Sequence, residues 1–132
     1  MKILFDTDTV IDYLTNNFSN EEIKIIDNVF KKHECGISVK SAADIHYYLN
    51  ESFDDKKAKE IRDVLNSSFR ILDISDESGI NIPGSDEKDY EKKIMITTAL
   101  SNGYDCIVTR NGESFINSSI RILSIRELTD NI

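Results

Sequence analysis

The 132-residue sequence predicts an α/β fold in three layers, with a five-stranded, mostly parallel sheet flanked by helices. Short apolar runs, which are typical of buried strands, alternate with longer segments whose apolar residues recur every three or four positions, as on one helix face. This alternation is typical of a parallel sheet with both faces covered. The chain contains no repeat, linker or low-complexity tract, and its length fits a single domain over residues 1–132.

Five apolar runs have the length of strands and are bounded by polar or turn-forming residues. We predict strands over residues 3–5, 35–39, 69–74, 106–108 and 120–124. The first run is apolar without interruption, which indicates a fully buried strand. Residues 76–85 contain the only proline and are predicted to form a short helix or a loop.

Start and stop signals indicate five helices between these strands. Ser19 and Glu22 fit a capping box, in which each side chain accepts a hydrogen bond from the other residue's backbone N–H group. The other helices are expected to begin after the acids that precede Val10, at Ser41, after Asp54 and near Asp86. The helix after Asp54 is expected to end near Leu65, and the last helix at Asn102–Gly103.

Composition is that of a folded globular protein, because 39% of the residues are apolar and 30% are charged, close to the average for this class. The formal charge of −8 argues against a broad basic surface of the kind that gives non-specific affinity for nucleic acid. A polyanion would therefore be reached through a local basic region, a divalent cation or a second chain. The most basic region is formed by Lys56, Lys57, Lys59 and Arg62.

Two further features bear on the compartment. Cys35 and Cys106 are isolated, without a CxxC pair or a histidine at zinc-ligand spacing, which fits a reducing environment and buried packing. No apolar stretch approaches the roughly 20 residues that a membrane span needs, and the first residues are too few for a signal peptide. We therefore expect a cytoplasmic protein that has no contact with a membrane.

Two carboxylates follow the first predicted strand directly. Asp6 stands where that strand ends, and in an open parallel sheet the carboxyl ends of the strands face the ligand crevice. Asp6 or Asp8 would also suit the start of the next helix, because aspartate accepts hydrogen bonds from the unpaired N–H groups of a first turn. The sequence leaves both roles open.

Four segments carry a resemblance to a known family across nearly the whole chain. They are residues 3–12, residues 37–45, residues 88–100, and residues 104–111 with Phe115. In their order and spacing they resemble the PIN-domain nucleases, which include the toxins of VapC-like toxin–antitoxin pairs. The resemblance implies a PIN-like fold with an acidic pocket at the carboxyl ends of the strands.

The function implied by this resemblance is that of a divalent-metal-dependent endoribonuclease of the toxin–antitoxin type. Its implied cofactor is Mg²⁺ or Mn²⁺, and its implied partners are RNA, a small antitoxin protein and a second copy of the chain in a homodimer. The chemistry is consistent, because hard divalent cations prefer oxygen ligands, activate a bound water and neutralise charge on a phosphate.

The family's acidic positions map onto this sequence one by one. The first and second acids correspond to Asp6 and Asp44, so both are retained as catalytic and metal-binding candidates. The third position holds Lys92 and the fourth holds Asn111. Asp89 lies one helical turn before Lys92 and is the expected third metal ligand.

The same resemblance suggests roles for further residues. Asn111 or Thr109 is expected to orient water or phosphate, and Arg110 to contact phosphate or to form a salt bridge. Asp86 and Glu91 are weaker substitutes for the missing acid, since acids in a first helical turn also complement the helix dipole.

Lys92 raises a particular question about the metal. Its ammonium group is expected to reach the space between Asp6 and Asp44, where it would relieve the repulsion of two carboxylates and stand in for the cation. The metal would then be lost, because a single positive charge does not acidify water as a divalent ion does. In the alternative, the long side chain extends into solvent and leaves room for metal.

Two other functions remain open. The displaced acids are consistent with a catalytically impaired PIN-like protein that acts in binding or regulation. The opening stretch also resembles the first motif of haloacid-dehalogenase-type phosphatases, in which Asp6 would be the nucleophile and Asp8 the general acid and base. Residues 84–89 resemble the acidic metal motif of those phosphatases, although here they follow a proline and open a helix.

Overall fold

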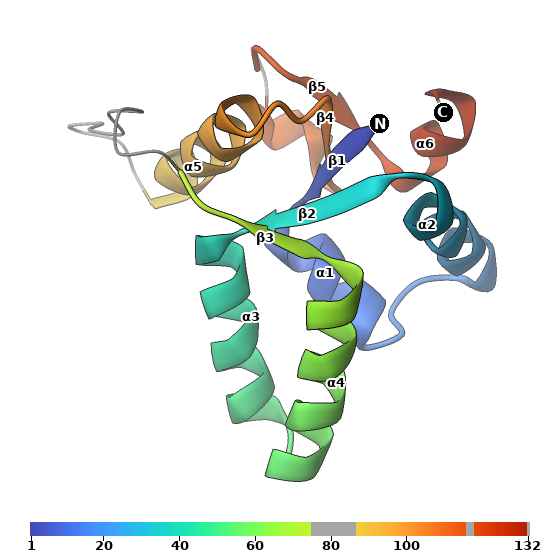
Figure 1. Cartoon of the computed structure of the whole chain (residues 1–132), viewed down its shortest axis with the longest axis vertical. Helices are drawn as coiled ribbons and strands as arrows, with labels where there is room; N and C mark the ends of the chain where they lie inside the picture. The colour runs from blue at the N-terminus through green and yellow to red at the C-terminus, as the bar shows by residue number, and fades with distance from the viewer. Residues whose placement is uncertain (75–86, 116–117, 132) are drawn as a thin grey trace.

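Strand β1 (Lys2–Phe5) lies at the centre of the sheet in the computed structural model, which describes residues 1–74, 87–115 and 118–131. The strands of these described residues are ordered β3-β2-β1-β4-β5, and every neighbouring pair is parallel (Figure 1). The remaining strands are β2 (Glu34–Ser38), β3 (Arg70–Leu72), β4 (Cys106–Val108) and β5 (Arg121–Leu123). The expected five-stranded parallel sheet is confirmed.

The order of the strands locates the ligand crevice. The chain builds from β1 outward to β3 and then adds β4 and β5 on the other side of β1, so the switch point lies between β1 and β4. In open α/β sheets, ligands bind outside the carboxyl ends of the strands near such a switch point. Asp6 follows β1 at this point, and Thr109 follows β4.

Helices cover both faces of the sheet and complete the three layers. The helical segments of the described residues are α1 (Thr7–Leu14), α2 (Asn20–Lys32), α3 (Val39–Ser52), α4 (Asp55–Ser68), α5 (Glu87–Ser101), the 3₁₀ turn η2 (Gly112–Phe115) and α6 (Ile125–Asn131). Helix α5 packs on one face, whereas α1 to α4 and α6 supply the core on the other. Helices α3 and α4 form a hairpin that extends away from the sheet (Figure 1).

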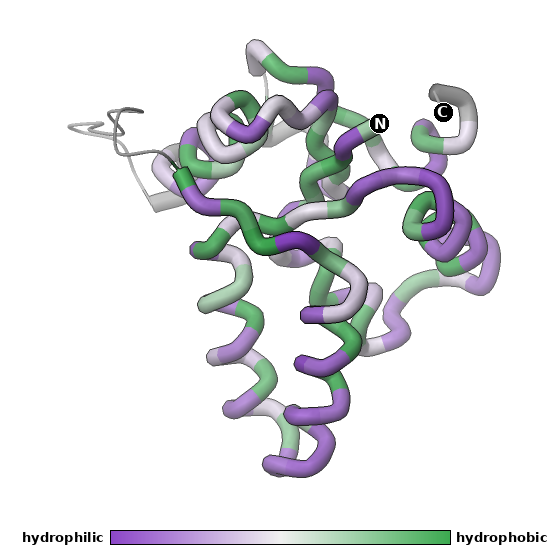
Figure 2. Tube along the Cα trace, in the orientation of Figure 1, coloured by the Kyte–Doolittle hydropathy of each residue, from purple (hydrophilic) through white to green (hydrophobic). Residues whose placement is uncertain are grey.

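The alternation of side chains along β1 divides the core in two. Ile3 and Phe5 belong to the larger apolar cluster, whereas Leu4 points to the α5 side. All three are at most 1% exposed. A strand segment with both faces covered must be apolar, as residues 3–5 are, whereas Figure 2 shows green and purple alternating along α3 and α4, which each bury one face.

Helix starts agree with the sequence signals. The capping box is present in α2, where the Glu22 backbone N–H donates to Ser19 Oγ and the Ser19 N–H donates to Glu22 Oε1, both at 3.2 Å. Asp54 caps α4 by accepting from the Lys57 N–H at 2.8 Å. Helix α3 begins at Val39, two positions before the expected start, because Ser38 already serves as its cap.

Some elements differ from the expectation. Helix α6 was not predicted, although Ser124 and Glu127 form a second reciprocal capping box, with bonds of 3.1 and 3.2 Å. Strand β3 is shorter than residues 69–74, because Phe69 ends α4 as its C-cap. The expected helix or loop over residues 76–85 lies outside the described residues. Among the described helices, none has the length and apolar character needed to cross a membrane.

Gly36 in β2 is required by a close approach of Tyr104. A Cβ atom at position 36 would lie 2.7 Å from Tyr104 Oη and 2.8 Å from Leu72 Cδ1. Tyr104 is buried, and its hydroxyl donates to Glu34 Oε2 at 2.6 Å, so the ring is held in place. The absence of a side chain at Gly36 therefore lets Tyr104 cross the sheet surface.

We expect Gly36→Ala to lower the free energy of unfolding by about 1–3 kcal/mol, as overpacking of a well-packed core does. Chemical denaturation measures this change. Gly112→Ala is the matched control, because its added Cβ would meet only Ile122 Cγ2 at 3.8 Å, and it should cost less than about 0.5 kcal/mol. Equal losses in the two variants would contradict the role given to Tyr104.

Candidate functional site

A cleft of about 590 Å³ lies at the carboxyl ends of the central strands. Its walls come from the β1–α1 junction, α3, α5 and the segment after β4. The lining residues are Asp6, Thr7, Asp8, Asp44, Glu91, Lys92, Met95, Asn111 and Phe115. The fold thus brings together the four positions aligned with the family's acids, and it adds Asp8 and Glu91. The backbone of Asp89 lies in α5, but its side chain is outside what the structure describes.

Asp6 has both of the roles that the sequence left open. It is the N-cap of α1, where Oδ1 accepts from the Thr9 backbone N–H at 2.9 Å, and it also lines the cleft. Its second oxygen, Oδ2, accepts from Thr109 Oγ1 at 2.5 Å. Each carboxylate oxygen retains a further lone pair, so the cap leaves Asp6 able to accept another ligand.

Thr109 lies beneath Asp6 and is only 1% exposed. Its hydroxyl donates to Asp6 and accepts from the Asn111 backbone N–H at 3.0 Å. The side chain therefore connects the end of β4 to the end of β1 and fixes the turn that carries Asn111. This burial favours a positioning role for Thr109 over the direct contact with substrate that the sequence suggested.

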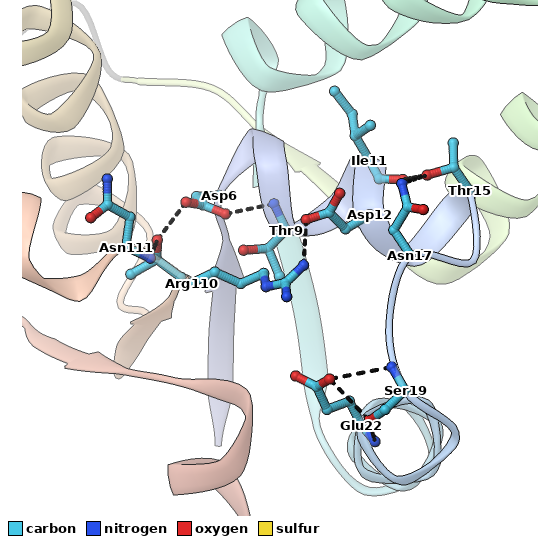
Figure 3. Close-up of polar contacts among 11 residues, drawn as sticks. Asp6, Thr9, Ile11, Asp12, Thr15, Asn17, Ser19, Glu22, Arg110 and Asn111 are labelled. Atoms are coloured by element: carbon cyan, nitrogen blue, oxygen red, sulfur yellow. Dashed lines mark hydrogen bonds and ion pairs between the residues drawn. The ribbon is translucent and has the colours of Figure 1, made fainter.

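Arg110 forms the salt bridge that was one of its two expected roles. Its Nη1 atom lies 2.8 Å from Asp12 Oδ2, and Figure 3 draws this ion pair as a dashed line. Its guanidinium lies 4.6 Å above the centre of the Phe18 ring. These contacts attach the segment after β4 to α1 and to the loop before α2. Arg110 is not among the residues that line the cleft.

Lys40 supplies a cation that the sequence alone did not identify as part of the site. Its Nζ atom lies 3.0 Å from Asp44 Oδ2 and 3.1 Å from Glu91 Oε1, so it joins α3 to α5. Hydrogen bonding to Asp44, followed by the bond to Glu91, raises the pKa of Lys40, and the ammonium stays charged. The four-residue spacing from Lys40 to Asp44 was the available signal, since such pairs meet on one helix face.

Lys92 also lines the cleft, as expected from its alignment. Within the described parts of the chain, however, it makes no ion pair, and Asp44 is bound by Lys40 instead. Asp6 is occupied by Thr9 and Thr109. The ammonium that compensates a cleft carboxylate in this structure is thus that of Lys40.

Asp8 lies in surroundings that disfavour its ionised form. Partial burial, together with the nearby carboxylates of Asp6, Asp12 and Glu91, raises the pKa of Asp8 above its ordinary value of 3.8. Like charges disfavour the ionised form, which is the direction expected where acids outnumber cations. A divalent cation bound in the cleft would relieve this repulsion.

The donor chemistry of the cleft fits a hard divalent cation, but the present rotamers do not form a complete site. The lining carboxylates, with the side-chain oxygens of Thr7 and Asn111, are the oxygen donors that Mg²⁺ and Mn²⁺ prefer. Across residues 1–74, 87–115 and 118–131, no three acidic, histidine or cysteine side chains are placed to hold one ion. Asp44 and Glu91 instead form ion pairs with Lys40, and this is one reason why the cleft carboxylates do not face a single ion position.

The fold and the cleft thus define an α/β protein with an acidic pocket at the carboxyl ends of a parallel sheet. The family model described as PIN domain matches residues 2–113, and the chain belongs to the PIN domain family. A comparison with curated protein sequences gives no match.

Solved structures share this fold at low sequence identity. VapBC2 from Rickettsia felis, bound to a DNA fragment from its promoter, gives a TM-score of 0.72 at 14% identity and covers 94% of this chain and 98% of that chain. DNA-bound VapBC from Salmonella typhimurium gives 0.71 at 19% identity, with 95% and 98% coverage. FitAcB from Neisseria gonorrhoeae gives 0.66 at 18% identity, with 94% and 98% coverage.

Membership of the PIN domain family replaces the phosphatase interpretation of the opening stretch. That interpretation needed an acidic metal motif at residues 84–89, of which residues 84–86 lie outside the described structure and residues 87–89 begin α5. Asp6 and Asp8 retain their place in the cleft.

We expect Thr109→Val to lower the free energy of unfolding by about 1–3 kcal/mol, because it removes the donor to Asp6 and leaves the Asn111 N–H without its acceptor. Thr98→Val is the control. Thr98 is equally buried, but its hydroxyl donates only to Ile94 O within α5 at 2.7 Å, so its loss should cost less than about 1 kcal/mol. Equal destabilisation in urea titrations would contradict a special role for Thr109.

The substitution Asp8→Asn tests whether the cleft disfavours a negative charge at this position, because its effect on stability should depend on pH. A carboxyl group whose pKa is raised on folding binds its proton more tightly in the folded state, so its contribution to stability is present at low pH and is lost as pH rises through the raised value. In EDTA, Asp8→Asn should therefore raise the melting temperature near neutral pH, and this gain should vanish below the ordinary value of 3.8.

The control for Asp8→Asn is Asp55→Asn, which changes an acid in the first turn of α4. This substitution removes a favourable helix-dipole interaction, so it should lower the melting temperature slightly at neutral pH. A fall of similar size in Asp8→Asn would show that the cleft does not repel that carboxylate.

Proposed function

We propose that this protein is a divalent-metal-dependent endoribonuclease of the toxin–antitoxin type. The observation that carries the proposal is that Asp6, Asp44 and Glu91 line one cleft at the carboxyl ends of the central strands of a PIN domain. Carboxylates from separate elements that line one cleft suit a divalent cation, and a bound cation would in turn attract the anionic phosphodiester that the acids alone would repel.

Three residues would hold Mg²⁺ or Mn²⁺. Asp6 and Asp44 are the acids retained at the aligned family positions, and Glu91 is the described α5 acid that lines the same cleft. Asp89 remains a predicted ligand one turn away, on the strength of the sequence. When bound, the ion lowers the pKa of a coordinated water and neutralises charge that develops on the phosphate.

The remaining residues position these groups and the substrate. Thr109 holds Asp6 through its hydroxyl and fixes the Asn111 backbone, so it sets the distance between the two sides of the cleft. Asn111 carries an amide at the rim, where it would orient a phosphate oxygen or a water. Lys92, from the opposite wall, would offset the repulsion between an incoming phosphodiester and the acids.

The partners follow from the same assignment. RNA is the proposed substrate, a small antitoxin protein is the proposed inhibitor, and a homodimer is the proposed assembly. The VapBC neighbours that were solved with DNA support the antitoxin proposal at the level of fold. With these partners, the proposed compartment is the cytoplasm.

The second candidate is a catalytically impaired PIN protein that acts by binding. The observation in its favour is that two of the four aligned acid positions hold Lys92 and Asn111, while Lys40 is bound to Asp44 and Glu91. Too few free carboxylates would leave Mg²⁺ weakly held unless substrate phosphates complete its coordination.

Cleavage of mixed RNAs in Mn²⁺ by wild type and by Asp6→Asn tests the proposal. Asparagine is as good an N-cap as aspartate, so the variant keeps the bond from the Thr9 N–H while it loses the charge. We expect cleavage to fall by at least about a hundredfold, the scale on which loss of a group acting on the reacting water is felt.

The matched control is Asp54→Asn, which makes the same change at the N-cap of α4, away from the cleft. This control should cleave RNA as wild type does. Its change in melting temperature gives the effect on stability of replacing aspartate by asparagine at an N-cap. Equal cleavage by wild type and Asp6→Asn would refute the nuclease assignment at this cleft. No cleavage by any of the three proteins would favour the binding function.

A further inference from the structure

Lys40 stands at an electrostatically unfavourable place on its own helix. It is the second residue of α3, whose first turn contains no acid. The N-terminus of a helix carries partial positive charge, so a cation there is disfavoured by the helix dipole. The stability of α3 therefore does not explain a lysine at this position.

The contacts of Lys40 explain it better. Its ammonium joins Asp44, four residues along α3, to Glu91 on α5 at 3.0 and 3.1 Å. A small cavity beside this triad is lined by the same three residues together with Thr7, Ser38, Ser41, Ile94 and Met95. Asp44 and Glu91 also line the larger cleft, so the ammonium occupies carboxylates that face the proposed metal site.

We infer that Lys40 is an internal counter-ion that competes with the divalent cation for Asp44 and Glu91, and that metal binding displaces it from both carboxylates. This inference rests on the proposed metal-dependent function. In the absence of metal, Lys40 compensates the two acids. In the presence of metal, the acids turn to the ion and the ammonium is released toward solvent.

The strength of the triad is consistent with displacement. The side chain of Lys40 is 34% exposed, and those of Asp44 and Glu91 are each 45% exposed. Ion pairs that are this accessible to water are weak, and a lysine placed four residues before its acid has the less favourable orientation on a helix. A divalent ion with several oxygen ligands interacts more strongly with each carboxylate than a single ammonium does.

A comparison with Lys92 distinguishes direct competition for the carboxylates from general electrostatic repulsion of the metal ion. It lines the same cleft, but within the described residues it has no ion pair to release. If positive charge alone lowered metal affinity, removal of either lysine would have a similar effect. If occupation of the ligands is the cause, removal of Lys40 will have the larger effect.

The experiment measures Mn²⁺ binding by titration calorimetry, without RNA, in the whole protein. Lys40→Met keeps the apolar stem and removes the charge, and we expect it to tighten Mn²⁺ binding on the order of tenfold by ending the competition. Lys92→Met should change the affinity less. Lys59→Met breaks the similar Lys59–Asp63 pair on α4, at 3.2 Å and away from the cleft, and it should leave Mn²⁺ affinity unchanged.

A second readout follows the ammonium itself. Lysine side-chain NMR signals, assigned by their loss in Lys40→Met and Lys59→Met, are recorded while diamagnetic Mg²⁺ is added. The Lys40 signal should move toward the position of a solvated lysine and saturate with the same midpoint as Mg²⁺ binding. The Lys59 signal should stay in place.

The outcomes separate this inference from the proposed function. If wild type and Lys40→Met bind Mn²⁺ equally, or if Lys92→Met tightens binding as much, the competition by Lys40 is refuted while metal binding stands. A Lys40 signal that does not move as Mg²⁺ binds refutes it as well. If no variant binds Mn²⁺, and Asp6→Asn cleaves RNA as wild type does, both the inference and the metal-dependent function are refuted.

Discussion

The hydrogen bond from Thr109 to Asp6 joins the ends of the two central strands, and the geometry of the cleft depends on it. On one side, Asp6 anchors α1 through the Thr9 N–H; on the other, Thr109 anchors the segment that carries Asn111. Because Thr109 is buried, water does not compete for its hydroxyl, and the bond is stronger than a surface contact would be. One hydroxyl thus aligns a helix start, a carboxylate and an amide.

The cleft beside this hydrogen bond carries more negatively charged than positively charged side chains. Asp6, Asp8, Asp44 and Glu91 line the cleft with Lys92, and Lys40 lines the small cavity beside it, so carboxylates exceed ammonium groups. Partial burial and, after it, the nearby carboxylates of Asp6, Asp12 and Glu91 raise the pKa of Asp8. Nothing in the packing requires this surplus of carboxylates, since the apolar clusters lie on the two faces of the sheet and the acids lie beyond the strand ends. A surplus of this kind is typical of a functional site, because folding alone would select against it.

The fold was predictable because its signals are local. The uninterrupted run Ile3–Phe5 identified a strand covered on both faces, and the pairing of Ser19 with Glu22 identified a helix start. Helix α6 has the same kind of signal in Ser124 and Glu127, and it was overlooked because a helix of this length lacks a clear apolar period. Strand β3 was overestimated, because apolar Phe69 packs into the core as a helix cap and takes no part in the strand.

The candidate site was predictable only in part, for a different reason. Asp6, Asp44, Lys92 and Asn111 could be assigned by position, and all four line the cleft. The bridge from Lys40 to Glu91 spans 51 positions and depends on how α3 and α5 pack, which spacing along one helix does not reveal. The burial of Thr109 and the pairing of Arg110 with Asp12 likewise depend on tertiary contacts.

The bond between Asp6 and Thr109 also has a consequence for the order of events during synthesis. The two residues are 103 positions apart, so a ribosome has exposed β1, α1 and the α3–α4 hairpin long before the partner of Asp6 has been made. Until β4 pairs with β1, Asp6 has its helix cap but no second anchor, and the wall that carries Asn111 does not exist. A chain in which β4 has not yet paired with β1 therefore lacks one wall of this cleft.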